Sequence, residues 1–128
     1  MSTYDATLFN PPAPLAQVVL RSPAESGQLA VASMLLDTGA DVTLVPAAAV
    51  NQLNVVVETQ VQYELMGFDG ARTMAVAVQL EMIFLNKIFR GCFLLIDQAW
   101  GIVGRDILNL VSLSLGGPNQ LWAEQLPG

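Results

Sequence analysis

Residues 35–46 read LLDTGADVTLVP and join two apolar segments through a short acidic turn. The run 29–36 that leads into them is almost wholly apolar, which predicts a strand covered on both faces. Asp37 stands at the end of that run, where a buried carboxylate is costly unless something satisfies or uses it. Gly39 permits a tight turn and the close approach of another group. Asp-Thr-Gly on its own more often marks an ordinary β-turn, so its meaning depends on the rest of the chain.

Composition limits the classes of protein to which this chain can belong. Its 128 residues fit one domain with a modest core. A hydrophobic content of 53% with only 12% charged residues predicts a large buried fraction or a sizeable surface buried in an oligomer. The net charge is −6 and the five basic residues are scattered, which argues against nucleic-acid binding. The sequence lacks both a membrane-length apolar run and a secretory signal, so we expect a cytoplasmic protein with no membrane partner.

The residue types missing from the sequence narrow the chemistry further. There is no histidine, which removes Ser-His-Asp and Cys-His catalysis as well as histidine-ligated metal sites. The single cysteine, Cys92, excludes an intrachain disulfide and is expected to be a small buried hydrophobe on a strand. If the protein is an enzyme, carboxylates are the main candidates left for acid–base work.

Local patterns predict mostly strands. The proline-rich residues 1–14 indicate a flexible N-terminal arm. Two segments with alternating apolar side chains surround a glycine-containing turn at 67–70, which predicts a long β-hairpin. That hairpin could be a plain surface element or a mobile cover over a site, and the pattern does not separate the two. Further strands are expected at 15–20, 28–36, 88–96, 100–103, 112–115 and 121–123, with short helices at 47–53 and 107–111, the second being the clearer.

Two motifs stand in a fixed order around this hairpin: LLDTGAD at Leu35–Asp41 and GIVGRDIL at Gly101–Leu108. Over residues 15–115 the chain resembles the retropepsin family, the single-domain aspartic proteases of retroviruses and retrotransposons, together with their free-standing cellular and bacterial relatives. The resemblance implies an all-β, closed, barrel-like fold with a flap hairpin and one short C-terminal helix. It also implies that residues 15–128 form a single protease domain.

The same resemblance implies roles for individual residues. Asp37 matches the catalytic aspartate, Thr38 the residue whose hydroxyl links two active-site loops, and Gly39 the glycine whose carbonyl meets the substrate. Asp41 and Arg105 match an ion pair that steadies the loop. Asp106 stands where the family has Asp or Asn. Positions implied to contact substrate are Leu35, Ala40, Asp41, Val42, Leu44, Met66, Gly67, Phe68, Trp100 and Ile102, although core packing is the alternative for Leu35, Val42, Leu44, Trp100 and Ile102.

Aspartic-protease chemistry needs two carboxylates that share one proton, because like charges a few ångströms apart cannot both ionise. The chain has one Asp-Thr-Gly, so a single copy cannot supply the pair, whereas a symmetric homodimer can. The resemblance therefore implies an endopeptidase that acts on a peptide or protein substrate without a metal or cofactor. The terminal segments 1–14 and 119–128 are candidates for strands at the dimer interface.

Two other classes of function stay open at this point. One is a catalytically inactive retropepsin-like module used for dimerisation or peptide binding. Loss of Thr38, of Gly39 or of the hairpin would favour it, and all three are present. The other is a small β-barrel binding protein without peptidase ancestry, which would make the two motifs a coincidence.

Overall fold

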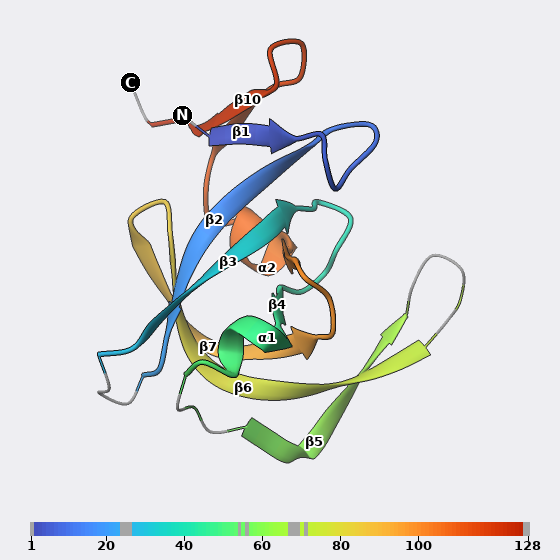
Figure 1. Cartoon of the computed structure of the whole chain (residues 1–128), viewed down its shortest axis with the longest axis vertical. Helices are drawn as coiled ribbons and strands as arrows, with labels where there is room; N and C mark the ends of the chain where they lie inside the picture. Colours follow the sequence, from blue (N-terminus) through green and yellow to red (C-terminus); the bar gives the residue numbers. More distant parts are fainter. Residues whose placement is uncertain are drawn as a thin grey trace.

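A computed structural model describes residues 2–23, 27–53, 55, 57–66, 70 and 72–126. The described part of the chain is built mainly of strands, with two single-turn helices (Figure 1). The elements are β1 (Ser2–Asp5), β2 (Ala13–Arg21), β3 (Leu29–Leu36), β4 (Leu44–Pro46), α1 (Ala47–Val50), β5 (Val57–Met66), β6 (Arg72–Phe84), β7 (Lys87–Ile96), β8 (Gly101–Val103), α2 (Arg105–Leu108), β9 (Leu113–Gly116) and β10 (Leu121–Glu124).

The strands form one continuous sheet in the order β5-β6-β7-β4-β8-β3-β2-β1-β10-β9. An additional pairing of β2 with β6 closes the six strands from β6 to β2 into a barrel. Closure removes the exposed edges of those strands, which would otherwise be free to pair with other chains. The predicted all-β, barrel-like fold is confirmed.

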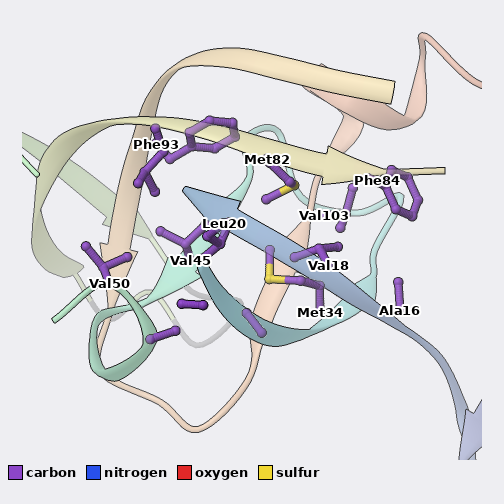
Figure 2. Close-up of a cluster of buried hydrophobic side chains, with 14 of the residues drawn as sticks. Ala16, Val18, Leu20, Met34, Val45, Val50, Met82, Phe84, Phe93 and Val103 are labelled. Atoms are coloured by element: carbon purple, nitrogen blue, oxygen red, sulfur yellow. The ribbon is translucent and has the colours of Figure 1, made fainter. Parts of the chain in front are cut away.

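The core fills the inside of this barrel. Figure 2 shows side chains from β2, β3, β4, α1, β6, β7 and β8 gathered in one cluster. Alternation explains the arrangement, because every second residue of a strand points to the same face. Val18 and Leu20 of β2 are 0% exposed, as are Met34, Val45 and Met82 from the strands around them.

The N-terminal segment differs from the flexible arm that its prolines predict. Residues 2–5 form β1, which pairs with β10 on one side and with the start of β2 on the other. Figure 1 shows β1 and β10 side by side at the top of the molecule. Trp122 of β10 is buried and its indole N–H donates to the carbonyl of Leu15 at 3.1 Å, which ties this end of the sheet to the barrel. Within the described chain both terminal segments therefore pair with each other.

Other element boundaries shift by a few residues. The two expected helices are single turns, at 47–50 and 105–108, and the second begins two residues earlier than its pattern suggests. The long hairpin is present as β5 and β6. Cys92 is exposed on β7, contrary to the expectation of a buried thiol, because it lies on the outward-facing side of that strand. Within the described residues, no helix has the length and apolar character needed to cross a membrane.

Candidate active site

The Asp-Thr-Gly loop leaves the barrel at the end of β3. Asp37 is half-buried, and its backbone N–H donates to the carbonyl of Val103 at 3.1 Å, which continues the pairing of β3 with β8. Its carboxylate Oδ1 accepts the N–H of Gly39 at 2.9 Å, and its carbonyl accepts the N–H of Ala40 at 3.2 Å. These bonds fold the loop back on itself and fix the direction of the Asp37 carboxylate.

Two glycines bring the second motif close to this loop. A Cβ on Gly104 would overlap the backbone of Val42, and one on Gly101 would overlap the sulfur of Met34 and the backbone of Leu44. Only glycine fits where another backbone approaches so closely. The GIVG sequence therefore lets β8 lie between β3 and β4, directly beneath the Asp37 loop.

Arg105 joins the loop to the start of α2. Its backbone N–H donates to the carbonyl of Ala40 at 2.9 Å, and its Nη1 donates to the carbonyl of Thr38 at 2.7 Å. Its Nη2 forms an ion pair with Asp41. Both side chains are largely open in the single chain, 43% exposed for Arg105 and 83% for Asp41, so the charge attraction itself is worth about 1 kcal/mol or less. The guanidinium acts here mainly by joining Thr38 and Asp41 in one geometry.

A second connection lies on the buried side of the same loop. Thr43 is 2% exposed, and its hydroxyl donates to Asp106 Oδ1 at 2.6 Å while accepting the N–H of Gly104 at 3.1 Å. The Thr43 N–H donates to Asp106 Oδ2 at 3.1 Å. Asp106 Oδ1 also accepts the N–H of Ile107. The Asp106 carboxylate accepts all three of these bonds, and it thereby joins Thr43 to the first turn of α2.

The apolar positions expected to line substrate pockets form a row across neighbouring strands. Ile102 pairs with Leu35 on one side and with Leu44 on the other, so the three side chains share one face. Leu35 and Ile102 are half-buried, whereas Leu44 is 8% exposed. The adjacent residues Met34, Val45 and Val103 point into the core, which places this row on the opposite face of the sheet.

The other expected pocket positions lie around this row. Ala40 and Trp100 are half-buried, and Val42 is 37% exposed. In Figure 1 the loop after β3 and the loop before β8 lie on the right-hand side of the molecule, as do the end of β5 and the start of β6.

One face of the hairpin near its tip carries exposed side chains. Met66 is 64% exposed and lies opposite Arg72, and Met74 is 57% exposed and lies opposite Glu64. Arg72 pairs with Glu64 across the strands at 3.0 Å. Gly67 and Phe68, two of the expected substrate contacts, lie outside the described residues.

Two residues with roles near this site do not follow from the sequence motifs. Thr43 is one, and the single polar side chain in the run from Val42 to Val45 is the signal that could have found it. Phe9 is the other: its ring meets the ring of Trp100, although the N-terminal segment carries no pattern that predicts the contact. Among the described residues, no group of three or more His, Cys, Asp or Glu side chains is arranged to hold a metal ion.

Comparisons with known proteins agree with this geometry. Residues 13–116 match the family model described as retroviral aspartyl protease. The structure resembles that of EIAV protease complexed with the inhibitor HBY-793, with a TM-score of 0.56 over 76% of this chain and 86% of that one. Sequence identity in that comparison is 23%, so the likeness is one of fold. A search of curated proteins found no match.

The match to this family model, on a closed barrel whose Asp-Thr-Gly loop packs against β8 with Gly101 and Gly104, places the chain in the class of retropepsin-like aspartic proteases. Because the family model covers most of its length, the chain belongs to the retroviral aspartyl protease family.

Proposed function

We propose that this protein is an aspartic endopeptidase that works as a homodimer, with the Asp37 carboxylates of its two subunits acting as a pair. The observation that carries the proposal is the Asp37 loop itself. A half-buried carboxylate is oriented by the N–H of Gly39 and clamped to a second motif through Arg105 and Thr43. An ordinary surface turn needs no such bracing from residues that follow more than sixty positions later.

The proposed reaction divides two tasks between two carboxylates. The ionised one removes a proton from a water molecule, whose oxygen attacks the carbonyl carbon of the peptide bond. The protonated one donates its proton to the carbonyl oxygen. The tetrahedral intermediate then collapses as the C–N bond breaks, and the leaving nitrogen takes a proton from the pair. One chain brings one such carboxylate in the Asp-Thr-Gly setting, so the second must come from another copy.

Substrate binding in this proposal uses the row of Leu35, Ile102 and Leu44 and the hairpin that ends near Met66. The half-buried Leu35 and Ile102 offer apolar surface beside the Asp37 loop, and the buried Leu44 packs next to Ile102. The hairpin provides strands that could lie over an extended peptide, with Thr38 and Gly39 meeting the second subunit and the substrate. The expected result is cleavage within peptides that carry apolar side chains next to the scissile bond.

The test is the variant Asp37→Asn, measured against wild type for cleavage of a mixed peptide library over a range of pH. Asparagine keeps the size of the side chain and an oxygen that can accept the N–H of Gly39. The variant is expected to stay folded and to cleave nothing at any pH. Wild-type cleavage should follow a bell with an acidic optimum, because the pair must hold one proton.

Reagents directed at serine, cysteine and metal enzymes are expected to leave the wild-type rate unchanged. Cleavage at the wild-type rate by Asp37→Asn would mean that the loop is structural. A folded, dimeric wild type that cleaves no peptide would favour the inactive module instead.

A further inference from the structure

Phe9 and Trp100 form an aromatic contact between two loops that are far apart in the sequence. Their ring centroids are 4.9 Å apart with an interplanar angle of 63°, the edge-to-face arrangement that aromatic rings prefer. Both side chains are half-buried. Trp100 lies directly before β8 and two residues before Ile102, at the end of the apolar row beside the Asp37 loop.

The loop that carries Phe9 is held in place at both ends. It spans residues 6–12 between β1 and β2, whose paired positions include Asp5 with Ala13. The carboxylate of Asp5 accepts the N–H of Thr7 at 2.9 Å and that of Leu8 at 2.7 Å, which turns the chain just before Phe9. The ring of Phe9 is therefore presented by an ordered connection.

Trp100 is fixed on its other side by the backbone that follows. Gly101 pairs with Met34 of β3, and it lies so close to Leu44 and Pro46 that a Cβ could not be accommodated. The backbone of Trp100 is thus held by the barrel, while its ring has Phe9 as its aromatic neighbour. Removing the Phe9 ring takes away this edge-to-face contact and leaves the pairing of Gly101 with Met34 in place.

We propose that Phe9 is a specificity-determining residue that acts through Trp100. By holding the indole in one orientation, Phe9 keeps the subsite beside the cleaved bond narrow. That subsite then accepts a slender apolar side chain such as leucine and rejects one as large as tryptophan. The inference rests on the proposed peptidase function and adds to it a class of substrate and a residue outside both sequence motifs.

The first experiment asks whether the contact exists in solution and needs no cleavage. Protein labelled with 5-fluorotryptophan gives a fluorine NMR signal from Trp100 and another from Trp122, assigned with the variant Trp100→Phe. Phe9→Ala should move the Trp100 signal and leave that of Trp122 in place, since Trp122 is buried elsewhere at 3% exposure. Leu8→Ala, a change to a 52% exposed neighbour in the same loop, should move neither.

The second experiment measures kcat/KM for two peptides that differ only in carrying leucine or tryptophan next to the cleaved bond. Phe9→Ala should shift the ratio toward the tryptophan peptide by roughly 3- to 10-fold. The change should appear mainly in KM, with kcat for the leucine peptide altered less than about twofold. Phe9→Tyr keeps the ring and should retain the wild-type ratio, as should Leu8→Ala.

Each outcome bears on a separate claim. An unmoved Trp100 signal in Phe9→Ala overturns the contact. An unchanged ratio in an active Phe9→Ala enzyme overturns the specificity role and leaves the proposed function standing. A wild type that cleaves neither these peptides nor any of a mixed library overturns the proposed function and this inference with it, whatever the fluorine signals show.

Discussion

At the residue scale, Gly104 shows how little space separates the two halves of the candidate site. Its N–H donates to the hydroxyl of Thr43, and the position of a Cβ is already filled by the carbonyl of Val42. The obstacle is backbone, which cannot swing aside as the end of a flexible side chain can. The identity of this residue therefore affects both the packing of the loop and the hydrogen bonds around Thr43.

Gly104→Ala should lower the free energy of unfolding by about 2–3 kcal/mol, because the added methyl group forces Val42 and the Asp37 loop apart. Thermal unfolding followed by circular dichroism measures the loss. Gly117→Ala is the matched control: a Cβ there meets nothing within 4 Å, so its effect should stay within about 0.5 kcal/mol. Equal melting temperatures for the two variants would contradict the close approach described here.

Sequence motifs predict some of these residues and miss others for a physical reason. Asp37, Asp41 and Arg105 lie in the two sequence motifs, and the family resemblance implies a role for each of them. Thr43 does not, because a threonine in an apolar run is equally typical of a β-strand. Its hydrogen-bond partners, the buried Gly104 and the exposed Asp106, follow it by 61 and 63 residues. Only the fold brings them together.

At the scale of elements, the neighbouring strands β2, β6 and β7 each place one charged side chain in a row on the outside of the barrel. Glu81 of β6 lies opposite Arg21 of β2 and opposite Arg90 of β7. Arg21 Nε donates to Glu81 Oε1 at 2.6 Å, and Arg90 pairs with Oε2. The hydrogen bond from Arg21 is the main cause that lowers the pKa of Glu81 from its ordinary value of 4.5, with Arg90 adding to it and burial opposing it.

Glu81→Gln should therefore destabilise the protein in a pH-dependent way. A lowered pKa in the folded state means that Glu81 stabilises the fold fully above its unfolded-state pKa, and that this contribution is lost as pH falls through the folded-state pKa. The difference in unfolding free energy between wild type and Glu81→Gln should be largest near neutrality and should shrink below about pH 4.5.

Urea unfolding at a series of pH values measures that difference. Glu64→Gln is the control, since the Glu64–Arg72 pair is largely exposed and should contribute little at any pH. A difference for Glu81→Gln that stays constant from neutral to acidic pH would show that the three charges do not interact as described.

Strands can be predicted where apolar and polar side chains alternate over many residues. They are missed where a short strand pairs with a segment that is far away in the sequence. The hairpin of β5 and β6 follows from its alternating side chains and the glycines between its strands. β1 cannot be predicted in this way, because it has only four residues and a proline-rich segment follows it. The partner that orders it, β10, begins more than a hundred residues later. The helices α1 and α2 are single turns, each following directly on a short strand of the barrel, β4 or β8.

At the scale of the whole molecule, the sequence predicts the barrel only through the family resemblance. Apolar content and alternation indicate an all-β domain, but they do not state which strands are neighbours. The parallel pairing of β3 with β8 and the closure between β2 and β6 join residues sixty or more positions apart. The two motifs lie at β3 and β8, so their resemblance to the retropepsin pattern implies the first pairing, whereas the second follows only from the fold that the family shares. The terminal segments 1–14 and 119–128 are candidates for strands at the dimer interface, and in the single chain they contain β1 and β10, which pair with each other.

Catalysis is expected to need Asp37 from two chains, and an experiment with mixed subunits tests this requirement. Wild type and Asp37→Asn are combined in equal amounts, allowed to exchange, and assayed at a fixed total concentration. If subunits pair at random, the cleavage rate should fall to about one quarter of the rate of wild type alone, since one dimer in four carries two aspartates. A rate of one half, proportional to the wild-type chains present, would show that each chain acts by itself and that no pair of Asp37 carboxylates is needed.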